Sequence, residues 1–373
     1  MDNIELDKFC TKYFEDIVKP KHLSKFEQKT PHGNSICGYI CHKPNKFLGS
    51  IVIARLNDKP VEQFVQAFPK IHYWDSRHQL KDEGIIHYAC NEKLDGTCLI
   101  IYPLKDEKGN VIELVPRTRE MAVADNHILD MYSLIDKNAI YNYFEGYSKE
   151  CSDVLMFELY GTLNRHEITY MDTYIDIKLI GMYVDNKFLT NDEMALILDS
   201  IVSLRIKPLL YINKGINESE FRIEWDFSNC RIFPYEFEID DTFPTLYDAI
   251  QEVKAILEKI NTEYYSYNNR SLVEGVVING IHVNGSQMYL KIKPTSIEYE
   301  ARQKRKIPRR FILKEVRKYF DEYGSEVKRL YEEDENHYLD YVSRNLKEEF
   351  GDKAYEPRTK KKIKKCFHGC MGF

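Results

Sequence analysis

Hydrophobic and polar positions alternate in short runs over roughly residues 50 to 300, and these runs are rich in β-branched and aromatic side chains. Such alternation is typical of strands that bury one face. The sequence predicts a short strand at 51–54. It also predicts a hairpin in which strands 97–104 and 111–115 flank the polar, glycine-containing segment 105–110.

A second hairpin is predicted further along the chain. Strands 274–278 and 288–293 flank an Asn-Gly pair at 284–285, and this dipeptide strongly favours tight turns. Helices interrupt the strand pattern. We expect one over about 191–204, capped by its first residue, and another over 245–260, where apolar residues recur at three- and four-residue steps.

After residue 300 the pattern becomes helical. Apolar residues recur every three or four positions from 312 to 330, which is one face of an amphipathic helix, and a second helix is predicted over 336–349. We therefore expect two domains. An α+β domain over 1–300 has antiparallel sheets with flanking helices, and a small helical domain with a basic tail covers 301–373.

Charge is divided unevenly between these two parts. The net charge of the chain is −6, but residues 301–373 hold 20 Lys and Arg against 13 Asp and Glu, a net of +7, so residues 1–300 carry −13. This segregation suits attraction to a phosphate backbone, although a solvated basic tail of no special use would have the same composition. The basic residues form two groups, 302–310 and Lys360, Lys361, Lys362, Lys364 and Lys365.

Composition also bounds the class of protein. The 373 residues are 43% hydrophobic, enough for a substantial core. There is no run of about 18 apolar residues, and the N-terminus lacks the basic start and apolar stretch of a signal peptide. We therefore expect a cytoplasmic protein without a membrane partner. The oligomeric state is not predicted.

Nine scattered cysteines fit no secreted disulfide framework and are interpreted as reduced thiols. Two small clusters could together supply tetrahedral zinc ligands, although neither has the paired Cys-x-x-Cys spacing of ribbons and fingers. A C-terminal tail is also more often disordered than liganded. The clusters are Cys37, Cys41 and His42, and Cys366, His368 and Cys370.

Five short motifs follow one another along the α+β domain. The first, Lys93-Leu94-Asp95-Gly96, lies just before the predicted strand 97–104 and is weak on its own. Chance explains each motif but not the series. The other four are Arg117-Thr118-Arg119, Phe157-Glu158-Leu159-Tyr160-Gly161, Glu274-Gly275-Val276-Val277 and Leu290-Lys291-Ile292-Lys293-Pro294.

Strand geometry brings charged members of these motifs together. Side chains alternate across a strand, so Lys291 and Lys293 project from the same face of 288–293. The predicted hairpin sets Glu274 beside the two lysines, which gives a cluster suited to a phosphate and a metal ion. For either lysine alone, a polar strand face in water would be the ordinary explanation.

In order and spacing the motifs resemble motifs I, Ia, III, IV and V of the covalent nucleotidyltransferases, the superfamily of ATP-dependent ligases and messenger-RNA capping enzymes. The resemblance covers about residues 46–300. It implies an ATP-grasp-like ligase domain that uses ATP and Mg²⁺, for which Mn²⁺ can substitute. Lys93 is then the nucleophile that becomes lysyl-AMP, Glu158 holds the ribose hydroxyls, and Glu274 engages the metal through water. Lys291 and Lys293 contact the α-phosphate.

The resemblance also implies further nucleotide-binding residues. Arg119 is expected to contact the nucleotide phosphate or the RNA end, and Asp95 and Gly96 to shape the loop that carries the nucleophile. Glu92, next to this loop, is counted with them. Phe68-Pro69-Lys70-Ile71 resembles the segment before motif I in the bacteriophage tRNA-repair type of RNA ligase, where a lysine contacts the ATP phosphates, and this role is carried to Lys70.

The chemistry explains why positive charge is needed. An amine attacks phosphorus only when it is neutral, and free lysine has a pKa of about 10.4, so the surroundings must lower the pKa by about three units, or roughly 4 kcal/mol. Lys291, Lys293 and Mg²⁺ would disfavour the protonated form of Lys93. The same charges would stabilise the transition state, in which negative charge collects on the non-bridging oxygens.

Architecture favours an RNA ligase within the superfamily. DNA ligases and capping enzymes follow motif V with an OB-fold, whereas only 80 residues follow Lys293 here and their pattern is helical. Residues 157–165, with Tyr170 beyond them, resemble the motif III region of the tRNA-repair branch. Two positions depart from that branch: Leu48-Gly49 stands where it has Arg-Gly, and Ile297 stands near the place of an expected aromatic residue.

We therefore expect an enzyme that seals 5′-phosphate and 3′-hydroxyl RNA ends in RNA repair or tRNA processing, through lysyl-AMP and RNA-adenylate. One alternative is a DNA or nick-sealing ligase with the same intermediate. Another is a non-catalytic RNA-binding protein that keeps the fold, but it predicts damaged motifs, and the charged residues of motifs I, III, IV and V are all present. The sequence leaves the natural RNA substrate open.

Overall fold

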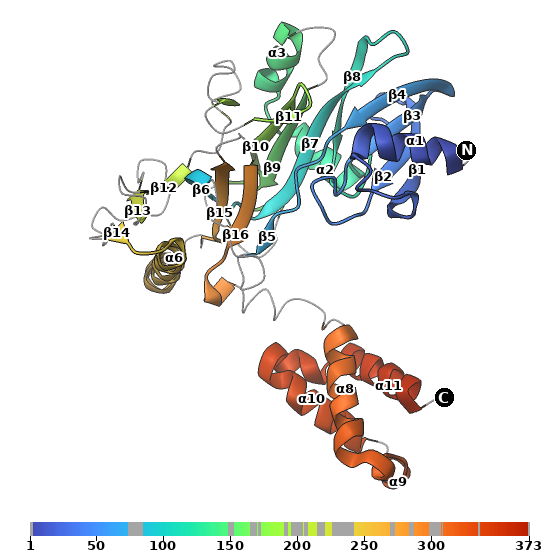
Figure 1. Ribbon diagram of the computed structural model, residues 1–373, viewed down its shortest axis with the longest axis vertical. Helices are drawn as coiled ribbons and strands as arrows, with labels where there is room; N and C mark the ends of the chain where they lie inside the picture. The colour runs from blue at the N-terminus through green and yellow to red at the C-terminus, as the bar shows by residue number, and fades with distance from the viewer. Residues whose placement is uncertain are drawn as a thin grey trace. The chain divides into compact units, whose positions relative to one another are not determined.

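The computed structural model describes residues 3–73, 85–147, 153–164, 170, 173–189, 193–194, 204, 208–214, 221–225, 242–268, 273–282, 287–297, 307, 309–334 and 336–371. It divides into two compact units, Met1–Pro294 and Thr295–Phe373. The described residues form helices and largely antiparallel sheets (Figure 1), as the α+β prediction requires.

A four-stranded antiparallel sheet opens the first unit. Its order is β1-β2-β3-β4, and the predicted strand at 51–54 lies within β3. One face packs against the N-terminal helix, where Phe9 and Phe14 contact side chains of β2 and β3. The elements are α1 (Asn3–Phe14), η1 (Pro20–His22), β1 (Leu23–Lys29), β2 (Ser35–Cys41), β3 (Ile51–Leu56) and β4 (Lys59–Val65).

A five-stranded sheet lies between the first sheet and two helices. Side chains of β7 alternate, so Leu99 packs against α2 and α3 while Ile100 packs with residues of the first sheet. The predicted hairpin of 97–104 and 111–115 is confirmed as β7 and β8. The order is β11 (Lys187–Phe188), β10 (Asp176–Val184), β9 (Val154–Tyr160), β7 (Gly96–Lys105) and β8 (Val111–Arg117), with α2 (Asn126–Ser133) and α3 (Asn138–Tyr147).

A seven-stranded sheet completes the first unit, and α6 covers one of its faces (Figure 1). The predicted second hairpin is confirmed as β15 and β16, although its Asn-Gly pair lies outside the described residues. The predicted helix 245–260 is confirmed as α6 (Leu246–Asn268), whereas 191–204 falls mostly outside the description. The order is β14 (Thr242–Phe243), β13 (Phe221–Trp225), β12 (Pro208–Lys214), β6 (Ile85–Glu92), β15 (Val276–His282), β16 (Gln287–Ile292) and β5 (His72–Tyr73).

The second unit is helical. The helix predicted from 312 to 330 is interrupted at Gly324, which has a φ of +47° and begins a short 3-10 turn. The helix predicted over 336–349 is confirmed. The elements are α8 (Arg309–Tyr323), η3 (Gly324–Glu326), α9 (Val327–Glu333), α10 (His337–Phe350), η4 (Gly351–Tyr355) and α11 (Pro357–Met371).

The C-terminal segment is a helix rather than the disordered tail that its terminal position favoured. Ile363, Cys366 and Phe367 of α11 are buried in the core of the helical unit, because they lie on one face of the helix. The ring of Phe367 stacks on that of Tyr338 at 3.7 Å between centroids. This apolar face fixes a lysine-rich sequence in place.

The cysteine and histidine clusters have ordinary partners. His42 is hydrogen bonded to Ser24, and His368 to the hydroxyl of Tyr331 at 3.2 Å. Over the described residues, no group of three or more His, Cys, Asp or Glu side chains is arranged to hold a metal ion. In the same part of the chain, no helix is both long and apolar enough to cross a membrane.

Candidate active site

Lys93 follows the last residue of β6, where the strand gives way to a short loop. Its backbone N–H donates to the carbonyl of Gly275 at 2.8 Å, which ties this loop to the residue before β15. Leu94 packs with Tyr160 and Tyr170, and the hydroxyl of Tyr170 accepts a hydrogen bond from the backbone of Asp95 at 2.6 Å. The loop that carries Lys93 is therefore held at three successive residues.

Glu274 joins Lys93 to Lys293. One carboxylate oxygen pairs with the ammonium of Lys93 and the other with that of Lys293. The side chains of Glu274 and Lys293 are only 2% and 4% exposed, while that of Lys93 is 18% exposed. Removing three charges from water is costly, and the loss of any one partner would leave a buried charge unpaired.

Backbone geometry explains how these three residues meet. Gly275 has a φ of +151°, and a Cβ there would overlap the carbonyl oxygen of Ile292 on the neighbouring strand. Only glycine permits this close approach. Because β15 starts and β16 ends beside this contact, Glu274 and Lys293 are brought together just outside the paired residues.

Lys291 lies one row further into the sheet. The register pairs it with Val277 of β15, and Val277 pairs with Asn91 of β6, so these side chains share one face. Asn91 and Val277 line a cavity. The opposite face, with Val276, packs against α6, so Lys291 belongs to the cavity face of the sheet.

The cavity lies between the seven-stranded and five-stranded sheets. Its walls are largely apolar and its charged residues are Glu92, Lys93 and Glu158. Two wall residues, Phe68 and Tyr289, have ring centroids 5.0 Å apart. The lining consists of Phe68, Ile71, Asn91, Glu92, Lys93, Leu94, Glu158, Ile180, Val277 and Tyr289.

Glu158 reaches the cavity from β9. The pKa of its carboxyl is raised to about 7, chiefly by burial; Lys93 and Arg119 lower it, and the negative charges of Glu274 and Asp95 raise it. This carboxyl therefore lies within electrostatic reach of the lysine cluster. It is poised near neutral pH, where it can donate or accept a hydrogen bond.

Arg119 is set beside Glu158 by the register of three strands. Glu158 pairs with Cys98, and Ile100 pairs with Arg117, so Arg119 follows in line with Cys98 just beyond the end of β8. Its Nε is buried and makes no hydrogen bond within the described residues.

A buried arginine that the sequence did not single out for a role supports Arg119. Arg117 is fully buried, which lowers the pKa of its guanidinium to about 10, and it donates to the carbonyls of Gly49 and of Met121, the latter at 2.8 Å. Gly49 has a φ of +84°, and a Cβ there would overlap Arg119. Gly49, which belongs to the Leu48-Gly49 pair that differs from the tRNA-repair branch, thus lies against Arg119. The Arg-x-Arg spacing of Arg117 and Arg119 was the sequence signal that could have indicated a role for Arg117.

The remaining expected residues occupy different positions. Gly96 opens β7, where a Cβ would overlap the carbonyl of Leu159, and Asp95 is buried beside it. Lys70 lies in the segment between β4 and β5, flanked by cavity residues but absent from the lining. Ile297 is buried in a short helical segment after β16.

Sequence reasoning gave no role to the apolar walls, although some of their residues lie in the sequence motifs. Ile180, Val277 and Tyr289 come from three strands, and no charged motif marked them as cavity residues. A larger cavity, of about 710 Å³, lies by β4 and the β7–β8 turn and is lined by residues such as Tyr13, Glu62 and Asp106. It contains none of the expected site residues.

Comparison with known proteins gives structural likeness only. No protein-family model matches the chain, and no curated protein does. An archaeal ATP-dependent RNA ligase is similar with a TM-score of 0.46 and 15% identity over 98% of this chain and 80% of that one. A protein from Aquifex aeolicus, named as a proposed ATP-dependent DNA ligase, gives 0.44 and 14% over 99% and 78%.

A variant of the RNA ligase from Naegleria gruberi, with AMP and Mn, gives a TM-score of 0.36 and 15% identity over 62% of this chain and 59% of that one. At these values the likeness assigns no activity, so function has to be inferred from the site residues. Solved ATP-dependent RNA ligases are among the structures that this chain resembles.

Proposed function

We propose that this chain is an ATP-dependent RNA ligase that joins 5′-phosphate and 3′-hydroxyl ends through an AMP bound to Lys93. One observation carries the proposal: the buried Lys93–Glu274–Lys293 cluster adjoins a cavity with apolar walls. We assign the adenylylation reaction to the unit Met1–Pro294, which holds every residue of the cluster.

The lining of the cavity matches the two ends of ATP in chemical kind, but the cavity measures only about 70 Å³ in this structure, so its walls would have to move apart to admit a nucleotide. The aromatic rings of Phe68 and Tyr289 and the apolar side chain of Val277 suit a base, and we assign to Glu158 the hydrogen bonds to the ribose hydroxyls. The lysines at the charged end suit the phosphates. Lys291, on the cavity face of β16, adds a further positive charge beside them.

In the first step the neutral Nζ of Lys93 attacks the α-phosphorus of ATP. A nitrogen–phosphorus bond forms, the bond to the β-phosphate oxygen breaks, and pyrophosphate leaves with the electron pair. The amine of Lys93 must also lose a proton. The carboxylate of Glu274, which is already paired with this amine, is the nearest acceptor for it. Lys293, and Lys291 behind it, would stabilise the added charge on the α-phosphate.

A divalent metal fits this site only if ATP and water supply most of its ligands. The described residues contain no group of three or more potential metal-binding side chains, and Glu274 is the acid closest to the reacting amine. Mg²⁺ commonly binds through one or two carboxylates plus phosphates and water, which matches this donor set. When bound, it would neutralise phosphate charge.

Two further transfers complete the proposed reaction. The AMP passes from Lys93 to the 5′-phosphate of an RNA end, which frees the lysine and forms RNA-adenylate. The 3′-hydroxyl of a second end then attacks that phosphate and AMP leaves. Our choice of RNA over DNA rests on the sequence around Glu158, because residues 157–165 resemble the motif III region of the tRNA-repair branch of RNA ligases.

The decisive test is covalent labelling. Incubation with α-labelled ATP and Mg²⁺, followed by denaturing electrophoresis, should give a labelled band for the wild type and none for Lys93→Ala, since alanine cannot form the bond. Lys59→Ala is the matched control, because Lys59 is an exposed lysine of β4 that pairs with Glu107. Labelling that persists in Lys93→Ala, or never forms in the wild type, would contradict the proposal. Labelled GTP in parallel tests the choice of nucleotide.

The polynucleotide is tested separately. Sealing of single-stranded RNA, of a nick in duplex RNA and of a nick in duplex DNA should be compared at equal concentrations. We expect joining of RNA ends. A preference for the DNA nick would replace RNA ligase by DNA ligase and leave the lysyl-AMP step intact.

A further inference from the structure

The final helix, α11, has an unusual distribution of charge. Its fifteen residues include six Lys and Arg and no acid. The buried residues of the helix lie on one face, so lysine and arginine occupy most of its solvent half. Arg358, Lys361 and Lys365 are exposed and lie at three- and four-residue steps, which makes them one stripe along the outside.

This stripe opposes the stability of the helix. Like charges three and four residues apart repel one another by about 0.2–0.5 kcal/mol per pair. No ion pair to Arg358, Lys361 or Lys365 is formed among the described residues, whereas Arg329 on α9 pairs with acids on both sides of it. The buried face already anchors α11, so packing does not require these charges.

The start of α8 extends the positive surface. Lys362 of α11 donates from Nζ to the carbonyl of Ile307 at 3.2 Å, so the chain entering α8 lies beside α11. Arg309, the first residue of α8, is exposed. We call Arg309, Arg358, Lys361, Lys362 and Lys365 together the basic surface.

We propose that the basic surface binds the phosphate backbone of RNA. This inference rests on the proposed function, because the bound RNA is taken to be the one whose ends are joined. Arg358 and Lys365 are seven residues apart, or about 10 Å along the helix, and this is the axial rise of about three nucleotides of one strand. Backbone contacts of this kind position a polynucleotide without reading its sequence.

A membrane surface fits α11 less well than RNA does. Helices that lie on membranes combine a basic face with exposed apolar side chains that enter the lipid. In α11, Ile363 and Phe367 are completely buried inside the helical unit. The basic surface thus offers charge without the apolar contact that lipid binding needs.

The test uses the full-length protein with Arg358, Lys361 and Lys365 all changed to alanine. Binding of labelled RNA, single-stranded and duplex, is measured by fluorescence anisotropy at several salt concentrations without ATP. Each lost phosphate contact lowers the dependence of log K on log salt by about 0.7 to 0.9. We expect at least about tenfold weaker binding near 0.1 M salt and a slope lower by about two.

A second triple variant is the matched control. Lys328, Arg344 and Lys347 are exposed on α9 and α10, and changing them to alanine removes the same charge from other helices. We expect its affinity for RNA to change by less than about twofold, because distant exposed charges are screened. Lys361→Glu, a single reversal, supplies an independent variant if the triple variant does not fold.

Several outcomes would overturn the inference. An equal loss of RNA affinity in both triple variants would show that only the net charge matters. Unchanged RNA affinity in the α11 variants would show that the basic surface does not bind RNA. Loss of binding to vesicles of anionic lipid with RNA binding intact would indicate a membrane surface, and a changed mass in light scattering would indicate contact between copies. Labelling of Lys93 needs no RNA, so a failure of labelling would contradict the ligase proposal without testing RNA binding by the basic surface.

Discussion

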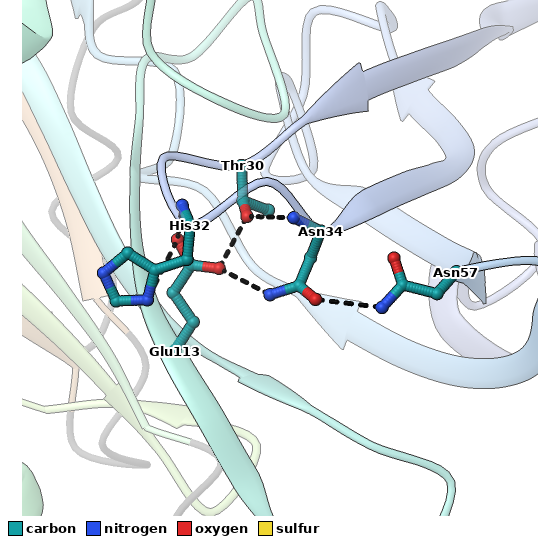
Figure 2. Close-up of polar contacts among 5 residues, drawn as sticks. All are labelled: Thr30, His32, Asn34, Asn57 and Glu113. Carbon is teal, nitrogen blue, oxygen red and sulfur yellow. Dashed lines mark hydrogen bonds and ion pairs between the residues drawn. The ribbon is translucent and has the colours of Figure 1, made fainter.

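Two buried glutamates in the first unit have opposite surroundings. Glu113 on β8 accepts hydrogen bonds from the Thr30 hydroxyl at 2.6 Å, the His32 backbone at 3.0 Å and the Asn34 side chain at 3.0 Å (Figure 2). These donors come from one turn, between β1 and β2, and Asn34 is held in turn by Asn57. The carboxylate therefore fixes a loop to the sheet.

Glu274 has charged partners from separate parts of the sequence. Lys93 follows β6 and Lys293 follows β16, and each ammonium takes one carboxylate oxygen. The cavity adjoins this cluster but not Glu113. Hydrogen-bond donors from a single turn serve structure. Ammonium groups gathered beside an accessible cavity leave protons and charge available for reaction.

The largest expected effect is that of Glu274→Gln. The amide cannot balance two buried ammonium groups, so the reacting amine would lose its position and its proton acceptor. We expect the rate of labelling from α-labelled ATP to fall at least about 100-fold, or about 2.7 kcal/mol. Glu113→Gln makes the same chemical change away from the cavity and serves as control. Equal loss of rate in both variants would erase the distinction between the two sites.

A smaller effect is expected for Glu113→Ala. Removing the carboxylate leaves the Thr30, His32 and Asn34 donors without their acceptor, which should cost about 2 kcal/mol of unfolding free energy. Denaturant unfolding measures this cost. The labelling rate of the folded variant should change less than about twofold, since no reacting group is touched. A large loss of rate with full stability would place Glu113 in the reaction.

The smallest effect is on stability and depends on pH. The folded-state pKa of Glu158 is about 7, above the ordinary 4.5, so folding favours the protonated carboxyl. Wild-type stability from this group is therefore full below about pH 4.5 and is lost as pH rises towards 7. Glu158→Gln does not titrate and should gain about 1 kcal/mol over wild type at pH 8 but not at pH 4.5, because cavity water softens the burial cost.

Unfolding curves at both pH values measure this difference. A variant that is less stable than wild type at pH 8 would show that the carboxylate is favoured in the folded protein. The labelling rate should fall in Glu158→Gln even as stability rises, since the amide replaces a group that we assign to the ribose. Gain of stability with loss of rate is typical of residues kept for function.

Local patterns were enough to predict the hairpins and the lysine pair. Alternation of apolar and polar residues fixed which face of β16 carries Lys291, and the register then placed it on the cavity side. The predicted hairpin brought Glu274 beside Lys293. These features depend on neighbours in sequence or on one hairpin, where periodicity is informative.

Features that depend on distant contacts escaped prediction. The buried guanidinium of Arg117 donates to the carbonyl of Gly49, in a turn almost seventy residues earlier, which no local pattern encodes. The helix break at Gly324 also escaped, because the apolar repeat continues across it. The C-terminal segment was judged by its terminal position, whereas Ile363 and Phe367 determine that it packs.

The hydrogen bond from the Lys93 backbone to the Gly275 carbonyl has a mechanical consequence. It couples the peptide chain at the amine to the chain directly after Glu274, so thermal displacement of β6 or β15 carries both partners along together. Their separation then varies through side-chain rotation alone. Alignment of the two groups that we propose to react is thus protected against small movements of the sheet, without any rigid ligand having to impose it.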